Sequence, residues 1–354
     1  MSSAAAKVPV RPYDWRKLLA ATTDLFAAMG ASERSAGLIA DHLVAANLTG
    51  HDSHGIGMIP GYDKGIARGD LRLGQELRVA NDTGALLICD GGQGPGQVMA
   101  HDAMALGIAR ARETGTCIVG LRDSYHIGRI GHWAEQCADA GLVSVHFVNV
   151  VSFPVVVPFG GKQPRLATNP FAAGFPSGDG RPPVIADFAT ATMALGKIRV
   201  AYNKGVAIPE NVILDAEGTP TTDPSVMFND PMGAILAFGG HKGSALNLAC
   251  ELLGAALFGG TVQSAAKMET TTLNSMFSVI VDPAVLGLSE NYLEREAAVR
   301  AYFASEPGVK LPGDVERETR AARMADGIPL DDTTMDQIRK IAADRGLDPA
   351  AFSA

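Results

Sequence analysis

The sequence lacks the short glycine-rich signatures of the common phosphate-binding loops. Gly92, Gly94 and Gly96 are too closely spaced for a Gly-x-Gly-x-x-Gly segment between a strand and a helix, and no Gly-x-x-x-x-Gly-Lys-Ser/Thr segment is present. The ordinary Rossmann fingerprint and the P-loop are therefore excluded.

Cysteine is scarce. The four residues, Cys89, Cys117, Cys137 and Cys250, lie far apart, and none belongs to a Cys-x-x-Cys pair. A zinc ribbon or a redox pair is therefore not supported. We expect these thiols to be small buried side chains in a reducing cytoplasm.

Long hydrophobic runs and excess positive charge are also missing. The most apolar stretch, 143–159, is interrupted by His146, Asn149 and two prolines, and is too short to cross a bilayer. The N-terminal Met-Ser-Ser-Ala-Ala-Ala-Lys has no apolar core of a secretory signal. The formal net charge of −8 disfavours nucleic acid. We therefore expect a cytoplasmic protein that binds neither nucleic acid nor membranes.

The 354 residues show helical periodicity near both ends and alternating strands and helices between them. We predict an α+β fold in which a helical unit, 10–77 plus 285–354, encloses a sheet unit, 78–284. The helix expected at 246–257 is so apolar that we predict burial on most of its sides. The other predicted helices are 14–30, 33–48, 62–69, 97–113, 130–140, 291–305, 315–325 and 334–344, and the predicted strands are 85–89, 116–121, 143–148 and 276–281.

The densest polar cluster is His51-Asp52-Ser53-His54-Gly55, directly after a predicted helix end. Histidine titrates near neutrality, and Gly55 allows a ligand to approach the backbone, so the cluster is a candidate acid/base centre. Two other interpretations are a helix-capping loop with solvated histidines and a zinc site. The zinc site would need a third ligand that the sequence does not indicate.

A second cluster, Ser-Tyr-His-Ile-Gly-Arg-Ile-Gly-His at 124–132, lies between a predicted strand and helix. Arg129 and the N–H groups of a helix start favour anions. The alternative is an ordinary loop with a surface arginine. His132 falls within the helix, and we interpret it as structural.

Three further segments carry weaker signals. Asp187 interrupts an apolar strand at 184–190, so it needs a partner such as a histidine, unless it only caps the next helix. Lys242, in the Gly-rich turn 239–244, could bind phosphate or ribose. The turn at 311–317 could be a simple helix cap.

Taken in order, the segments His-Asp-Ser-His-Gly, Ser-Tyr-His-Ile-Gly-Arg, Thr-Asn-Pro-Phe, Asp-Phe-Ala-Thr, His-Lys-Gly and Leu-Pro-Gly-Asp resemble the type-2 malate/L-lactate dehydrogenase family. The resemblance covers about residues 12–345. The stretches 51–60 and 125–136 most closely resemble its bacterial hydroxycarboxylate dehydrogenases.

The resemblance implies a non-Rossmann cofactor-binding sheet domain, mixed and largely antiparallel, with a helical domain formed from both chain termini. It implies NAD, with NADP possible, and a homodimer in which both subunits contribute to the site. It also implies hydride transfer between nicotinamide and C2 of a 2-hydroxy or 2-oxo carboxylate.

The resemblance also assigns roles to residues. His54 matches the acid/base histidine, with Ser53 beside it and Asp187 as its partner, and His126 is the rival acid/base group. The positions where relatives contact the dinucleotide are His54, Gly128, Arg129, Ile130, Thr168, Asn169, Ile185, Ala186, Asp187, Phe188, Ala189, His241, Lys242, Asn274, Gly313, Asp314, Val315 and Glu316.

One position departs from the family pattern. Many relatives have an arginine for the substrate carboxylate where this sequence has Met58. Arg129 or backbone amides would then bind the carboxylate, and Met58 suits an aromatic or longer acid. We expect a phenylpyruvate, hydroxyphenylpyruvate or 2-oxoglutarate reductase. The alternatives are a cyclic imino-acid or sugar-acid reductase and, from another class, a metal-dependent hydrolase or lyase.

Overall fold

The computed structural model describes residues 10–264 and 272–354, which divide into two compact units. The larger unit takes its described residues from Val8–His146, Ala172–Asp187 and Ser278–Ala354. The smaller unit takes them from Phe147–Phe171 and Phe188–Phe277. The N-terminal heptapeptide on which the expectation of no secretory signal rests lies outside the described residues.

The helices of the larger unit agree closely with the sequence prediction. The Asp14 side chain caps α1 (Trp15–Ala28) by accepting hydrogen bonds from two first-turn N–H groups, and α2 has the predicted bounds, Glu33–Leu48. No helix within 10–264 and 272–354 is long and apolar enough to cross a membrane. The other α-helices of this unit are α3 (Ile59–Arg68), α4 (Gly96–Thr114), α5 (Gly131–Asp139), α8 (Ser289–Ala304), α9 (Asp314–Asp326) and α10 (Asp332–Asp344).

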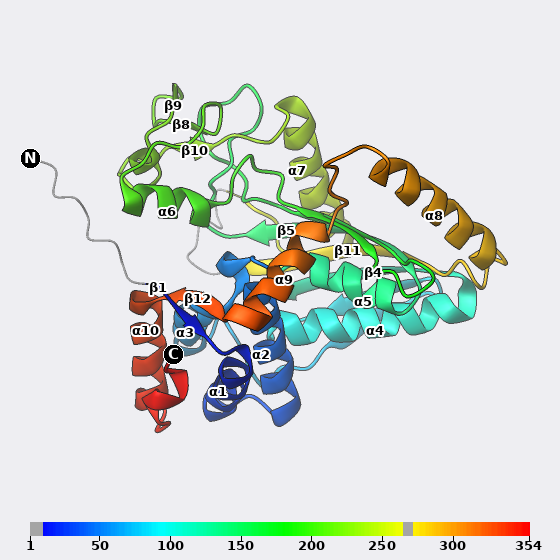
Figure 1. Cartoon of the computed structure of the whole chain (residues 1–354), viewed down its shortest axis with the longest axis horizontal. Coiled ribbons are helices and arrows are strands. Elements are labelled where there is room, and N and C mark those ends of the chain that lie inside the picture. Colours follow the sequence, from blue (N-terminus) through cyan, green and yellow to red (C-terminus); the bar gives the residue numbers. More distant parts are fainter. Residues whose placement is uncertain (1–9, 265–271) are drawn as a thin grey trace, which may run out of the picture. The chain divides into compact units, whose positions relative to one another are not determined.

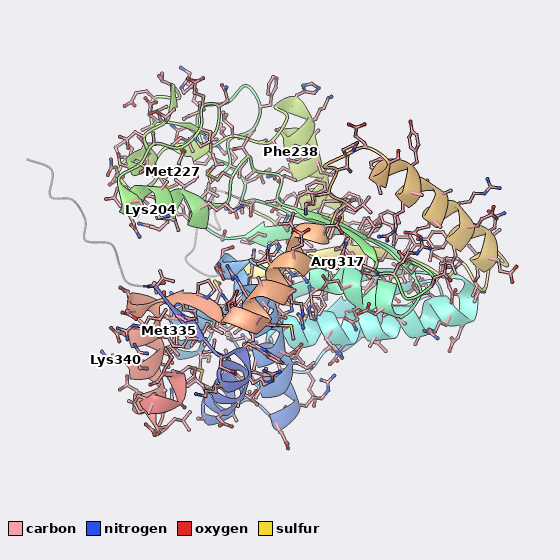
Figure 2. All side chains as sticks on the ribbon, in the orientation of Figure 1. Lys204, Met227, Phe238, Arg317, Met335 and Lys340 are labelled. Carbon is pink, nitrogen blue, oxygen red and sulfur yellow. The ribbon has the colours of Figure 1, made fainter. Side chains whose placement is uncertain are left out.

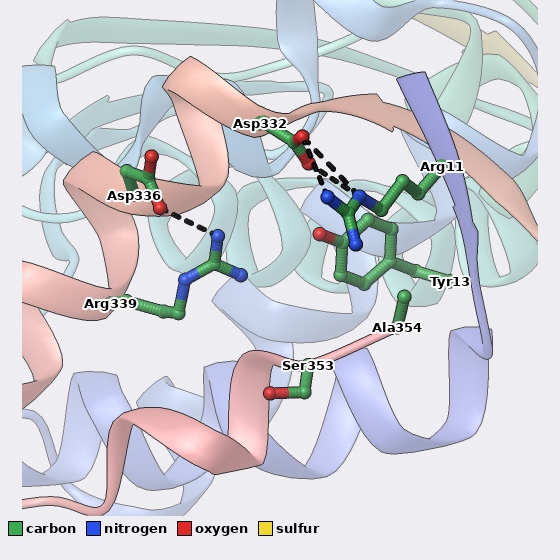
Figure 3. A pocket seen from close by; sticks show the side chains of 7 residues that line it. All are labelled: Arg11, Tyr13, Asp332, Asp336, Arg339, Ser353 and Ala354. Carbon is green, nitrogen blue, oxygen red and sulfur yellow. Dashed lines mark hydrogen bonds and ion pairs between the residues drawn. The ribbon is translucent and has the colours of Figure 1, made fainter. Parts of the chain in front are cut away.

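Segments from both ends of the chain lie side by side in the larger unit. Strand β1 (Val10–Tyr13) pairs antiparallel with β12 (Ile328–Asp331), and Arg11 forms an ion pair with Asp332 (Figures 1 and 3). In α10, Met335 is buried and Lys340 is exposed (Figure 2). Beside this ribbon is a pocket of about 340 Å³ that no sequence-predicted site residue lines; its lining residues are Arg11, Tyr13, Asp332, Asp336, Arg339, Ser353 and Ala354 (Figure 3).

The strands of the larger unit belong to a sheet with the order β2-β3-β4-β11-β5-β6-β7. β2 and β3 are antiparallel, whereas β3 and β4 are parallel, with α4 as the crossover between them. The predicted α+β class and mixed sheet are therefore confirmed. The strands are β2 (Arg78–Asp82), β3 (Leu86–Asp90), β4 (Thr116–Ser124), β5 (Val143–Val151), β6 (Phe171–Phe175), β7 (Val184–Phe188) and β11 (Leu273–Val281).

The predicted division into 10–77 plus 285–354 and 78–284 does not coincide with the two compact units. Strands β5, β6, β7 and β11 each run from residues of the larger unit into residues of the smaller one. Because the units divide within strands, no turn or linker marks the boundary in the sequence. The helical and cofactor-binding domains stay a prediction.

The smaller unit has an apolar core that includes Val156, Ile198, Ile213, Met227 and Ile235. Around it lie α6 (Leu195–Lys204), α7 (His241–Gly254) and a three-stranded antiparallel sheet in the order β10-β8-β9. The strands of this sheet are β8 (Ile213–Leu214), β9 (Pro220–Thr221) and β10 (Ala234–Ile235).

The prediction that helix 246–257 is buried on most sides is wrong. Leu248 and Leu252, one turn apart on α7, are 51% and 53% exposed. Asn247 and Glu251 are buried instead, and the side chains of both accept a hydrogen bond from Asn169 Nδ2. The helix therefore has one polar buried face and one apolar exposed face, the reverse of the usual surface helix.

In the larger unit, α4 packs against β4 through Gly107. A Cβ atom at this position would lie 2.6 Å from Val119 Cγ2 and 2.7 Å from Ile280 Cδ1, both on buried residues. Glycine here allows the helix to lie close to the sheet, at the cost of a weaker helix former.

Replacing Gly107 with alanine should lower the free energy of unfolding by about 1–3 kcal/mol, because the added methyl group overpacks this contact. Gly37 in α2 is a matched control, since a Cβ there meets nothing within 4 Å. Gly37→Ala should stabilise the protein by about 0.5–1 kcal/mol. Urea denaturation of both variants measures the difference; equal effects would contradict the close packing of α4 on the sheet.

Candidate active site

The loop that carries His54 is fixed to the end of α2. After Gly50, residues Asp52–His54 form a short 3-10 turn, and the Asp52 carboxylate accepts hydrogen bonds from Asn47 Nδ2 at 2.7 Å and from Arg323. Asn47 Oδ1 accepts the N–H of Ile56 at 2.8 Å. Asn47 thus holds both sides of the loop.

Gly55 is required by this arrangement. A Cβ at residue 55 would lie 2.1 Å from Asn47 Oδ1, and the neighbouring side-chain atoms are equally close. The glycine therefore allows close packing of the loop on α2. The role expected for Gly55 from the sequence was instead the close approach of a ligand to the backbone.

His54 and His126 form a hydrogen-bonded pair. His54 Nδ1 lies 3.0 Å from His126 Nε2, and the two rings are nearly parallel, with an interplanar angle of 5°. On its other side, His126 Nδ1 lies 2.6 Å from the hydroxyl oxygen of Tyr62. Gln97 Nε2 donates to that same oxygen at 2.6 Å. The structure therefore brings together the two rival histidines of the sequence analysis.

Burial keeps both imidazoles neutral. It lowers the pKa of His126 to about 4, and together with the nearby His126, His51 and Arg129 it lowers the pKa of His54 to about 3. Burial also raises the pKa of Tyr62 well above its ordinary value. Near neutral pH, these four side chains therefore form an uncharged hydrogen-bonded chain of one amide, one phenol and two imidazoles.

The second loop, between β4 and α5, is also held by α2. The N–H of Arg129 donates to His42 Nε2 at 2.8 Å. Gly128 has a φ of +79°, and a Cβ there would lie 1.9 Å from the same nitrogen. Burial lowers the pKa of His42 well below its ordinary value, so its Nε2 is available as an acceptor.

Arg129 is a buried positive charge that forms ion pairs with two carboxylates. Its side chain is 3% exposed and forms a hydrogen-bonded ion pair with Glu135 and a longer ion pair, 3.9 Å, with Asp187. Arg129 is therefore already bonded within the protein, and less available to a substrate carboxylate than the sequence suggested.

The predicted pairing of Asp187 with His54 is corrected by the structure. Asp187 Oδ2 accepts the N–H of Gly131 at 2.8 Å and faces Arg129, while His54 Nδ1 is occupied by His126. Burial raises the pKa of Asp187, and Arg129 opposes that rise. Asp187 has a charged partner, as a buried carboxylate requires, but the partner is an arginine.

The remaining predicted residues of the larger unit differ in their contacts and in their burial. His51 Nε2 lies 3.4 Å from Glu316 Oε1, and this contact lowers the pKa of Glu316. Gly313, with a φ of +93°, starts α9, and Asp314 accepts the N–H of Leu311. Ser53 and Val315 are exposed; Ile130 and Ile185 are buried, and Ala186 is half-buried.

Within the smaller unit, the predicted residues fall into two groups. Asn169 and Asn274 are buried and bonded: Asn169 to Asn247 and Glu251, and Asn274 to the carbonyl of Asn149. His241 and Lys242 are exposed at the start of α7. Thr168 accepts from Thr190 through its carbonyl, Phe188 is 40% exposed, and Ala189 is half-buried.

Three residues of the site were not among the predicted residues: Tyr62, Gln97 and His42. Tyr62 and Gln97 look like ordinary residues of predicted helices. His42 could have been noticed, because it interrupts the apolar face of α2 beside Leu43 and Val44. Within 10–264 and 272–354 no group of three or more His, Cys, Asp or Glu residues is placed to hold a metal ion.

The neutral pair has a consequence for acid stability. The folded-state pKa of His126, about 4, lies below its ordinary value of 6.5, so unfolding takes up a proton between these values. The stability is full above about pH 6.5 and is lost as the pH falls toward 4. His126→Gln should reduce the slope of unfolding free energy against pH, near pH 5, by up to about 1.4 kcal/mol per unit. An unchanged slope in urea titrations would show that His126 takes up no proton on unfolding.

Comparison with known proteins agrees with the motif order. The malate/L-lactate dehydrogenase family model matches residues 13–339. Hydroxycarboxylate dehydrogenase B of Escherichia coli K12 is 46% identical over 314 residues, 87% of each chain. L-lactate dehydrogenase of Cupriavidus necator is 40% identical over 306 residues, 84% of this chain and 88% of the relative. The crystal structure of delta1-piperideine-2-carboxylate reductase from Pseudomonas syringae is 30% identical with a TM-score of 0.84, and covers 94% of this chain and all (100%) of that chain. The resemblance is confirmed: this chain belongs to the malate/L-lactate dehydrogenase family.

Proposed function

We propose that this protein is an NAD(P)-dependent 2-hydroxycarboxylate dehydrogenase that acts on acids of the phenylpyruvate, hydroxyphenylpyruvate or 2-oxoglutarate type. The observation that carries the proposal is the neutral, hydrogen-bonded pair of the half-buried His54 and the buried His126. Oxidation of a hydroxyl group needs a base for the hydroxyl proton, and a neutral imidazole is such a base near neutral pH.

His54 is the member of the pair that would exchange a proton with the substrate. Both nitrogens of His126 have protein partners, His54 and Tyr62, whereas His54 uses Nδ1 for this bond. Its Nε2 is therefore the atom for the substrate oxygen. A bound nicotinamide supplies the hydride acceptor or donor at C4. The protein's own task is to hold the hydroxyl or oxo group against Nε2 and to move one proton there.

The residues around the pair fit a dinucleotide in their chemistry. At the start of α9, the Glu316 carboxylate can accept a hydrogen bond from a ribose hydroxyl group. We propose NAD as the cofactor, with NADP as the alternative, bound by a non-Rossmann sheet domain rather than by a glycine-rich fingerprint.

We also propose that the protein is a homodimer in the cytoplasm. Leu248, Leu252 and Leu257 are 51%, 53% and 59% exposed, and a second subunit would cover such a surface. The four cysteines are free and buried, as is usual in a reducing compartment.

One alternative has support from a specific relative. The Pseudomonas syringae structure is that of a cyclic imino-acid reductase and has nearly the same fold. Reduction of a C=N bond would use the same hydride and the same proton site, so a cyclic imine carboxylate is the second substrate class to test.

We expect NADH or NADPH oxidation with a panel of 2-oxo acids to show higher kcat/KM for phenylpyruvate or hydroxyphenylpyruvate than for oxaloacetate. The reason is Met58, which is half-buried, apolar and only four residues after His54, and which suits an aromatic side chain better than the short carboxymethyl group of oxaloacetate. Absorbance of the reduced cofactor measures turnover. No turnover with any 2-oxo acid or cyclic imine would refute the proposal.

Met58→Arg is the matched variant for the same panel. It should shift the preference toward oxaloacetate by about tenfold or more, because a bidentate arginine–carboxylate contact contributes more than about 1.4 kcal/mol. An unchanged order of substrates would show that Met58 does not face the substrate.

His54→Ala should lower kcat by about a hundredfold or more, because it removes the atom that exchanges the proton. His126→Ala should be less damaging, since it removes only the partner of that ring. The melting temperature of each variant controls for folding. If His126→Ala has the larger effect on kcat, the roles of the two histidines are the reverse of those proposed.

A further inference from the structure

We propose that Gln97 is a positioning residue that determines which ring nitrogens of the His54–His126 pair carry protons, through a hydrogen-bond chain that passes from its amide through Tyr62. The proposal rests on the proposed function, in which this pair moves the substrate proton. Among the described residues, the side chain of Gln97 bonds to Tyr62, and it acts on the histidines through that phenol.

The chain is built from rigid and buried parts. Gln97 is in the first turn of α4 and Tyr62 is in α3, and each is 1% exposed. The start of α4 presses on the second loop, since a Cβ at Gly96 would lie 2.3 Å from the carbonyl oxygens of Tyr125 and His126. The chain between Gln97 and Tyr62 is therefore shielded from bulk solvent.

Each link contains one proton, so the direction of the whole chain is set together. With Gln97 Nε2–H donating to Tyr62, the phenol hydrogen is directed to His126 Nδ1. His126 must then carry its proton on Nε2 and donate it to His54 Nδ1. In this direction, His54 holds its single proton on Nε2 and cannot accept another there.

Turning the Gln97 amide reverses the chain. Its Oε1 then accepts the Tyr62 proton, Tyr62 accepts from His126 Nδ1–H, and His126 Nε2 accepts from His54 Nδ1–H. His54 Nε2 now carries a lone pair and can accept the hydroxyl proton of the substrate, which gives an imidazolium with no further rearrangement. One proton leaves the hydroxyl oxygen and one N–H bond forms at His54.

The state of the Gln97 amide supports this role. Its Oε1 is buried and has no hydrogen-bond partner among residues 10–264 and 272–354. Turning the amide therefore breaks no bond to Oε1 and exchanges one bond to Tyr62 for another. A buried amide with an unused oxygen is costly unless that oxygen is used in another state of the protein.

Other charged or titratable groups face the pair from neighbouring elements. They are His51 before the 3-10 turn, Arg129 and Tyr125 on the second loop, and His42 on α2. None of them bonds to Gln97, so their influence is the same in all Gln97 variants.

Two substitutions of similar size should have opposite effects. In Gln97→Glu, the carboxylate can only accept from Tyr62, which favours Nδ1–H on His54 and stabilises the imidazolium. In Gln97→Met, Tyr62 keeps His126 as its single acceptor, which favours Nε2–H on His54. The apparent pKa of kcat/KM for hydroxy-acid oxidation should rise by about one unit in Gln97→Glu and fall by a similar amount in Gln97→Met.

The tautomers can be read without turnover. Nitrogen-15 NMR of histidine-labelled protein distinguishes Nδ1–H from Nε2–H rings, and His54→Ala and His126→Ala spectra assign the two signals. We expect the Nδ1–H form of His54 in Gln97→Glu and the Nε2–H form in Gln97→Met. If the tautomers are the same in both variants, the proposal is overturned.

Gln136→Met is the matched control. Gln136 has the same hydrogen-bond state, with Nε2 donating to the carbonyl of His101 and a buried Oε1 without a partner among the described residues, but it does not contact Tyr62. It should change neither the tautomers nor the pKa; a shift equal to that of Gln97→Met would mean that the effect is general loss of packing. If no acid is turned over but the tautomers move as expected, the chain is supported and the proposed function fails.

Discussion

The hydrogen bond between His54 and His126 is the constraint on which the site depends. Two imidazoles whose Nδ1 and Nε2 atoms lie 3.0 Å apart cannot both be charged, and because burial lowers both pKa values, neither ring is charged near neutral pH. The pair therefore holds at most one extra proton. Every other group around it either fixes the two rings in contact or sets where that proton lies.

Helix α2 sets the distance between the two rings. Its Asn47 bonds to both sides of the loop that carries His54. Its His42 accepts the backbone N–H of Arg129, in the loop that carries His126. Gly55 and Gly128 are the positions where each loop meets these side chains, and neither position has room for a Cβ. Two polar side chains on the buried face of one helix therefore position two segments far apart in the sequence.

The helices and both histidines could be predicted from the sequence, because helical periodicity, caps and local clusters are short-range signals. Asp14 and the bounds of α2 are examples. The partner of Asp187 could not, because Gly131 and Arg129 approach it only after β7 and α5 have packed. Tyr62 and Gln97 were missed since a single polar residue in a helix carries no local sign of its partner. The exposed leucines of α7 were misread, because an apolar face looks the same whether another subunit or the core covers it.

The actual partner of Asp187 matters for the chemistry. A carboxylate in contact with His54 would raise its pKa and hold the ring as an imidazolium, which is an acid and not a base. Instead, Asp187 and Glu135 face Arg129, whose positive charge would otherwise be buried and unpaired. With the carboxylates engaged there, the hydrogen-bond partner of His54 among the described residues is the neutral His126. The neutral form is therefore the resting form of His54. The imidazolium forms only when a substrate delivers a proton to Nε2, which requires the direction of the hydrogen-bond chain in which His54 Nε2 carries a lone pair.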